Sequence, residues 1–126
     1  MKINKTILVI DDDSHIRRVI ELKLRKAGYE VIIAENGESG IQICNTRLPD
    51  AVITDVVMPK MDGKAVLRRT KELKKEYSFL TIIISCSIGF EEHHWIKDIP
   101  DTHFMEKPFS LNKVLDCVDQ YFGIKR

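Results

Sequence analysis

Acidic side chains follow two apolar runs of the sequence. Asp11, Asp12 and Asp13 come directly after the first run, and Asp55 follows a later one. Carboxylates that lie close together repel one another and stay ionised more readily when a cation lies among them. Oxygen ligands of this kind suit Mg²⁺, which keeps several waters and often shares a phosphate group. These residue types therefore indicate a Mg²⁺ site that handles phosphate, provided that the fold brings them together.

A lysine, a hydroxyl and a nucleophile would complete the chemistry of such a site. The ammonium of Lys107 can offset negative charge and contact a phosphoryl oxygen, and the hydroxyl of Ser85 can donate a hydrogen bond to the same group. An aspartate such as Asp55 can itself attack phosphorus to give an aspartyl phosphate. Each residue alone has a simpler interpretation, since Asp13 or Ser14 could cap a helix and Lys107 could be a solvated surface lysine. Their joint appearance after successive apolar runs favours the site.

Five short runs of β-branched and aliphatic residues alternate with segments of helical spacing. The runs span residues 6–10, 30–34, 51–54, 81–85 and, more weakly, 103–106. Several are almost wholly apolar, as strands covered on both faces are. A strand–helix order repeated five times predicts an α/β fold, with a parallel sheet and helices on both of its faces. Ligands of such sheets bind beyond the carboxyl ends of the strands, where the polar residues named above lie.

Apolar stripes at helical spacing predict the helices between the strands. The clearest stripes span residues 16–27 and 111–122, and weaker ones span 41–48 and 66–73. Gly28 is typical of a residue that ends the first helix, and Ser110 is typical of the N-cap of the last. A helix between the last two strands is expected to begin near Phe90. Because Pro100 resists helix continuation, this segment should be short or distorted.

Composition and charge are those of an ordinary globular domain. Of the 126 residues, 44% are hydrophobic and 31% are charged. A net charge of +1 gives no general attraction to nucleic acid or to an anionic membrane. No apolar stretch approaches the length that spans a membrane, the start is unlike a signal peptide, and the three cysteines form no CxxC pair. We therefore expect one cytoplasmic domain over residues 1–126, with its core at about 5–122.

Taken in order, four segments resemble the receiver domains of two-component response regulators. They read ILVIDDD, ITDVVMPKMDG, IIIS and FMEKPF, and the resemblance covers residues 5–122. It implies a doubly wound, flavodoxin-like sheet of five parallel strands in the order 2-1-3-4-5. It also implies a signalling domain that accepts a phosphoryl group from a sensor histidine kinase or a phosphotransfer protein and then switches its binding to an output protein or domain. Turnover would be limited to self-phosphorylation and self-dephosphorylation, so we expect no enzyme in the usual sense.

The resemblance also assigns roles to individual residues of the site. Asp55 resembles the phosphoacceptor, and Asp11 and Asp12 resemble the acidic pair that holds Mg²⁺, with Asp12 the more direct ligand. Asp55 itself and the main-chain carbonyl of Val57 resemble the other metal ligands. Lys107 resembles the lysine that contacts the phosphoryl group.

Switch residues are assigned in the same way. Ser85, at the end of the fourth strand, resembles the switch hydroxyl, and Ser87 is the alternative if that strand runs longer. Phe104 resembles the aromatic residue that rotates between two states, although without a hydroxyl it would switch by burial alone. The peptide bond before Pro108 is expected to be cis. Residues 97–102 depart from the Gly-Ala that receivers usually carry there, which leaves open whether a homodimer forms through the usual face.

Two other classes of function are compatible with parts of the pattern. A Mg²⁺-dependent phosphohydrolase also uses an Asp nucleophile, but it generally needs a substrate-covering cap and a DxD arrangement, and the sequence has no spare segment for a cap. The N-terminal receiver fragment of a longer transcription regulator would look the same, because the few residues after Phe122 could not form a DNA-reading helix. We expect no direct contact of this chain with nucleic acid or with a membrane.

Overall fold

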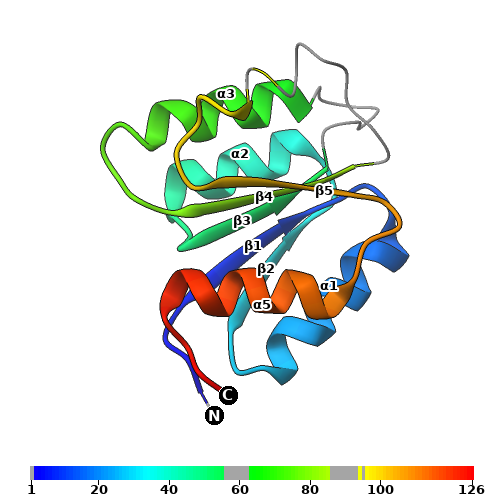
Figure 1. Cartoon of the computed structure of the whole chain (residues 1–126). Coiled ribbons are helices and arrows are strands. Elements are labelled where there is room, and N and C mark those ends of the chain that lie inside the picture. The colour runs from blue at the N-terminus through cyan, green and yellow to red at the C-terminus, as the bar shows by residue number, and fades with distance from the viewer. Residues whose placement is uncertain (1, 56–62, 86–93, 95) are drawn as a thin grey trace.

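Five parallel strands form one sheet, with helices on both faces (Figure 1). The computed structural model describes residues 2–55, 63–85, 94 and 96–126. The strand order is β2-β1-β3-β4-β5, which confirms the predicted doubly wound α/β fold. The strands are β1 (Thr6–Ile10), β2 (Glu30–Ala34), β3 (Ala51–Thr54), β4 (Leu80–Ser85) and β5 (Thr102–Glu106). The first three have the predicted bounds, and β4 and β5 each begin one residue earlier.

Helices α1 and α5 cover one face of the sheet, and α2 and α3 cover the other (Figure 1). Their bounds are α1 (Ser14–Lys26), α2 (Gly37–Thr46), α3 (Gly63–Leu73) and α5 (Leu111–Phe122). The label α4 is kept for the segment before β5, in which residues 94 and 96 are helical. The expected start of that helix near Phe90 lies outside the described residues.

Side chains of β1 alternate between the two faces of the sheet, and all five are buried. Ile7 and Val9 belong to the core between the sheet and helices α1 and α5. Leu8 and Ile10 belong to the core between the sheet and helices α2 and α3. Because both faces are covered, every residue of the strand after Thr6 is apolar, and the first acidic residues appear only where the chain leaves the core.

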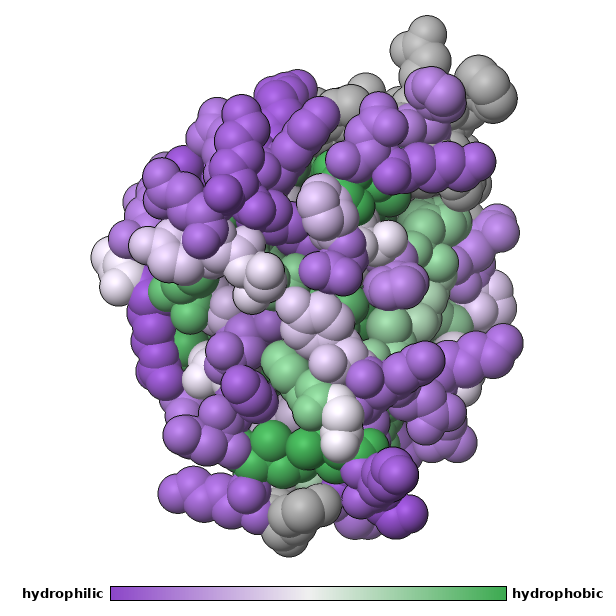
Figure 2. Space-filling model, turned by 60° about the vertical axis from the view of Figure 1, so that its left-hand side comes forward, coloured by the Kyte–Doolittle hydropathy of each residue, from purple (hydrophilic) through white to green (hydrophobic). Residues whose placement is uncertain are grey.

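Hydrophilic side chains cover most of the face seen in Figure 2, and apolar side chains form separate patches among them. Among the described residues, the large hydrophobic side chains that are exposed are Leu22, Ile33 and Tyr77. No helix in the described part of the chain is both long enough and apolar enough to cross a membrane.

Helix α1 begins immediately after the acidic residues that follow β1. The predicted cap, Asp13 or Ser14, is Asp13, whose carboxylate accepts hydrogen bonds from backbone N–H groups of the first turn. The helix ends at its C-cap Ala27, and Gly28 follows with φ 106°, a left-handed conformation that favours glycine. Because only residues 11–13 join β1 to α1, their carboxylates stay at the carboxyl edge of the sheet.

An uncommon turn leads into β5. Asp101 has φ 50°, a left-handed conformation that residues other than glycine seldom adopt. The ammonium of Lys74 stabilises this turn by donating to the main-chain carbonyls of Pro100 and Asp101 and to the hydroxyl of Thr102. Burial lowers the pKa of Lys74 to about 8. The departure noted at residues 97–102 therefore coincides with a turn that a lysine holds in place.

The side chains of Tyr29, Asp119 and Arg126 form a cluster that links the last residue of the chain to α5 and to the α1–β2 turn. Asp119 of α5 accepts hydrogen bonds from the hydroxyl of Tyr29 at 2.6 Å and from Nε of Arg126 at 2.7 Å. Arg126 also donates to the carbonyl of Ala27 at 2.8 Å. We call Tyr29, Asp119 and Arg126 the C-terminal latch. It lies where the two termini meet, at the end of the sheet opposite the carboxyl ends of the strands (Figure 1).

We predict that Arg126→Gln lowers the free energy of unfolding by about 1.5 kcal/mol at neutral pH. Burial alone would raise the pKa of Asp119, but the hydrogen bonds from Arg126 and Tyr29 outweigh it, so its native pKa lies below the ordinary value. The contribution of Asp119 is therefore present above its unfolded pKa and is lost as the pH falls through the native pKa.

The difference between wild type and Arg126→Gln should accordingly shrink as the pH falls below the unfolded pKa of an aspartate, about 3.9. Urea denaturation across this range measures it, with Lys125→Gln as a control that removes the neighbouring charge. A difference that stays constant with pH would contradict the role assigned to Asp119.

Candidate functional site

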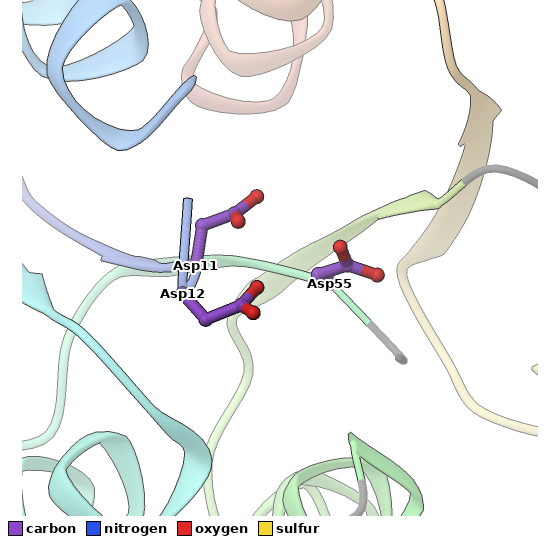
Figure 3. A group of neighbouring side chains, drawn as sticks. All are labelled: Asp11, Asp12 and Asp55. Atoms are coloured by element: carbon purple, nitrogen blue, oxygen red, sulfur yellow. The ribbon is translucent and has the colours of Figure 1, made fainter. Parts of the chain in front are cut away.

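Three carboxylates meet at the carboxyl edge of the sheet (Figure 3). Asp11 and Asp12 follow the last residue of β1, and Asp55 follows the last residue of β3. The two strands are neighbours and pair Ile10 with Thr54, so the next residues along each strand lie side by side. One oxygen from each carboxylate lies within 4.8 Å of the others. The structure thus brings together the three acidic residues that the sequence predicts as one site.

The acidic cluster is buried on one side and open on the other. Asp11 and Asp55 are 3% and 6% exposed, whereas Asp12 is exposed to solvent. The backbone N–H of Asp13 donates to Asp11 Oδ1 at 2.9 Å, which restrains that carboxylate. An exposed third carboxylate leaves a side on which Mg²⁺ could retain its waters. The donor set, which consists of carboxylate oxygens alone, fits Mg²⁺.

Lys107 supplies a positive charge from the end of β5, the outermost strand on this side of the sheet. Because β4 lies between β3 and β5, the side chain of Lys107 spans the end of β4 to reach Asp55. Its Nζ donates to Asp55 Oδ2 at 2.8 Å and lies 3.6 Å from Asp11 Oδ2. Its main-chain N–H donates to the carbonyl of Ser85 at 2.8 Å. The Lys107–Pro108 bond is cis, which confirms the prediction.

The acidic cluster carries more negative charge than Lys107 can balance. Burial raises the pKa of Asp11, and the charges of Asp55 and Asp12 raise it further, although the N–H of Asp13 and the ammonium of Lys107 act in the opposite direction. A carboxylate whose ionised form is disfavoured in the folded state reduces stability at neutral pH. A divalent cation would reverse this effect, because each carboxylate would then face opposite charge.

Ser85 ends β4 at the same edge of the sheet. Its side chain is fully buried, and within the described part of the chain its Oγ has no hydrogen-bond partner. Buried hydroxyls are normally paired, so an unpaired one at this edge is available to a further acceptor. Thr81 Oγ1 is unpaired as well, but it lies near the start of β4, so position singles out Ser85. Ser87, the alternative hydroxyl, lies outside the described residues.

Phe104 lies on β5, next to Ile83 of β4. Its half-buried ring packs against the apolar cluster formed by Leu67, Ile83, Ile96 and Ile99. The switch roles of Ser85 and Phe104 stay predictions. Val57 lies outside the described residues, and its role as a metal ligand also stays a prediction.

One contact at the site was not predicted from the sequence. Arg17, on α1, donates from Nη1 to the main-chain carbonyl of Asp11 at 2.8 Å. In the sequence Arg17 lies off the apolar stripe of its helix, where its residue type indicates only a solvated surface. No spacing rule identifies this contact, because it depends on the reach of a long side chain back to the preceding strand.

Comparisons with known proteins agree on one family. The response regulator receiver domain family matches residues 7–119. Sporulation initiation phosphotransferase F of Bacillus subtilis is 32% identical over 126 residues, which cover 97% of both chains. The probable transcriptional regulator ycf27 of Cyanophora paradoxa is 37% identical over 111 residues, which cover 87% of this chain and 45% of that protein. The chain spans less than half the length of the transcriptional regulators to which it is similar.

Solved structures share the fold. A CheY-like response regulator receiver domain protein from Methanospirillum hungatei superposes with a TM-score of 0.86 at 22% identity, covering 94% of each chain. A putative response regulator from Chloroflexus aurantiacus superposes with a TM-score of 0.80 at 29% identity, covering 94% of this chain and 98% of that one. The chain therefore belongs to the response regulator receiver domain family. Such a domain is a signalling phosphoacceptor rather than an enzyme in the usual sense, and the acidic triad is typical of the Mg²⁺ site of receivers.

We predict that Asp11→Asn raises the thermal stability of the metal-free protein. Asparagine removes a carboxylate whose ionised form burial disfavours, yet its amide oxygen can still accept from the N–H of Asp13. The gain should be about 1 kcal/mol, or about 4 °C in the melting temperature, and should vanish as the pH falls through the native pKa of Asp11. Thermal unfolding in EDTA measures it, with Asp98→Asn as a control at an exposed position.

Added Mg²⁺ should raise the melting temperature of the wild type and of Asp98→Asn by mass action, and should have little effect on Asp11→Asn. If Asp11→Asn is less stable than the wild type in EDTA at neutral pH, repulsion does not dominate the energetics of the cluster.

Proposed function

We propose that this chain is a phosphorylation-switched receiver domain in which Asp55 accepts the phosphoryl group. One observation carries the proposal. The carboxylate of Asp55 lies beside those of Asp11 and Asp12 and accepts a hydrogen bond from Lys107. Phosphoryl transfer requires positioning and charge neutralisation more than covalent machinery, and this arrangement supplies both. The donor in this proposal is a phosphohistidine of a sensor histidine kinase or a phosphotransfer protein.

In the proposed reaction, an oxygen of Asp55 attacks the phosphorus of the phosphohistidine. An O–P bond forms, the N–P bond breaks, and the histidine nitrogen keeps the electron pair. Lys107 exchanges its contact with Asp55 for one with a phosphoryl oxygen. Mg²⁺, held by Asp11, Asp12, Asp55 and the carbonyl of Val57, would supply further positive charge for the phosphoryl oxygens. Hydrolysis of the acyl phosphate by water restores Asp55.

Ser85 and Phe104 carry the switch in this proposal. A phosphoryl group on Asp55 would offer an acceptor to the buried Oγ of Ser85. Movement of Ser85 toward this group would open space for the half-buried ring of Phe104. Since phenylalanine has no hydroxyl, burial alone would drive its rotation. The surface formed by the segment before β5, by β5 and by α5 would then have two arrangements, which bias the binding of an output partner.

We also propose that residues 1–126 form a single receiver domain that acts in the cytoplasm. The similarity to sporulation initiation phosphotransferase F extends over nearly the whole of both chains, which supports a receiver that is a separate protein. The similarity to transcriptional regulators, which extends over less than half of their length, supports a second candidate, the receiver part of a longer regulator. The intact mass of the protein purified from its native cells distinguishes the two.

We predict that the wild-type chain gains one phosphoryl group when it is incubated with Mg²⁺ and acetyl phosphate. Asp55→Asn should gain none, because a carboxamide is not a nucleophile of this kind. Asp50→Asn is the matched control, since the same substitution then lies next to the opposite end of β3 and should leave phosphorylation intact. Intact-mass spectrometry, with and without EDTA, detects the adduct. The assignment is wrong if the wild type gains no group or if Asp55→Asn gains one at the same edge.

A further inference from the structure

Two adjacent arginines of α1 have different partners. Arg17 is half-buried and donates from Nη1 to the main-chain oxygen of Asp11 at 2.8 Å. Its neighbour Arg18 donates to Glu21, one turn further along the same helix, at 2.9 Å, and its side chain is 62% exposed. The two arginines carry the same charge, but only Arg17 contacts a residue of the acidic site, whereas Arg18 contacts its own helix.

The carbonyl that Arg17 contacts belongs to the peptide that joins Asp11 to Asp12. The N–H of Asp11 donates to the carbonyl of Ala34, the last residue of β2. Asp11 follows the last residue of β1, so its own carbonyl lies past the regular pairing of β1 with β2, and the guanidinium of Arg17 donates to it there. Holding this carbonyl fixes the peptide plane between the two acidic residues, and with it the direction in which Asp12 leaves the main chain.

Further hydrogen bonds restrain the same loop. The N–H of Asp13 donates to Asp11 Oδ1 at 2.9 Å, and the N–H of Arg17 donates to the carbonyl of Asp13 at 3.0 Å. The carboxylate of Asp11, its main-chain carbonyl and the first turns of α1 therefore form one connected unit. Groups behind the ligands of a metal site orient those ligands, and their loss commonly weakens metal binding by about 10-fold or more.

We propose that Arg17 is a positioning residue that sets the orientation of Asp11 and Asp12 as Mg²⁺ ligands. The inference rests on the proposed function, because it adds a residue to the same site. Charge and geometry predict opposite effects of removing Arg17. As a cation near the site, Arg17 repels Mg²⁺, so its removal would strengthen binding. As a positioning residue it orders the carboxylates, so its removal weakens binding.

The test compares Arg17→Met with Arg18→Met. Both variants lose one positive charge from the same turn of α1, but only the first loses a contact with Asp11. Titration of the ¹⁵N-labelled, unphosphorylated protein with MgCl₂, followed by two-dimensional NMR, measures the dissociation constant of each. Arg17→Met should bind Mg²⁺ about 10-fold more weakly than Arg18→Met, which should bind it as tightly as the wild type or slightly more tightly.

Phosphorylation by acetyl phosphate gives a second measurement. In Arg17→Met, the Mg²⁺ concentration for half-maximal rate should rise by about the same factor, and the rate at saturating Mg²⁺ should stay within about twofold of the wild type. A general loss of folding would instead lower the rate at every Mg²⁺ concentration. If Arg17→Met does not fold, Arg17→Gln replaces it, because glutamine also lacks the guanidinium and its reach.

Mg²⁺ binding by the Arg17 variant that is equal to or tighter than that of Arg18→Met would overturn the positioning role. That result would leave the proposed function intact, provided that the wild type gains a phosphoryl group and Asp55→Asn does not. A wild type that neither binds Mg²⁺ nor gains a phosphoryl group would contradict the proposed function itself.

Discussion

Repulsion among three carboxylates organises the carboxyl edge of the sheet. Parallel strands in register end at the same edge, and the neighbouring positions of β1 and β3 place their acidic ends together. Asp55 cannot move away from Asp11 without breaking the backbone pairing of the two strands, because its own N–H donates to the carbonyl of Ile10. The negative charge must therefore be met by a cation, and Lys107, which directly follows the edge strand β5, contacts both buried carboxylates. Strands β1, β3 and β4 are buried and largely apolar behind this edge, which makes its charge tolerable.

The fold and the acidic centre were predictable because they depend on simple patterns. A strand covered on both faces is mostly apolar, and an acidic residue directly follows each of β1, β2 and β3, which marks where these strands end. The early start of β5 was not visible, since Thr102 is a polar residue of an edge strand. The early start of β4 was not visible because Phe79 and Leu80 are both apolar, so residue type does not mark where the strand begins. Asp11, Asp12 and Asp55 were found because residue type and strand end coincide. Those patterns say nothing of how far a side chain reaches.

Three contacts made by long cationic side chains were not predictable for this reason. Arg17, Lys74 and Arg126 have the residue types of a solvated surface, yet each donates to a main-chain carbonyl that lies outside the regular hydrogen bonding of a strand or a helix. Such carbonyls occur where an element stops, and their positions are known only once the elements are assembled. They are the carbonyls of Asp11 after β1, of Pro100 before β5, and of Ala27 after α1.

Lys107 lies in the sequence between two segments that side-chain contacts hold in place, and these contacts limit which parts of the chain could move when the site changes. The turn before β5 is held by Lys74, and the far end of α5 is held by the C-terminal latch. The main chain of Lys107 is bound to Ser85 of β4, so its ammonium is the part that can exchange partners while the strand stays paired. Any displacement of α5 that follows would pivot about Asp119, since Tyr29 and Arg126 clamp that end. The largest movement is then expected near Ser110, the N-cap of α5. Ser110 lies three residues after Lys107, at the end of the helix opposite Asp119.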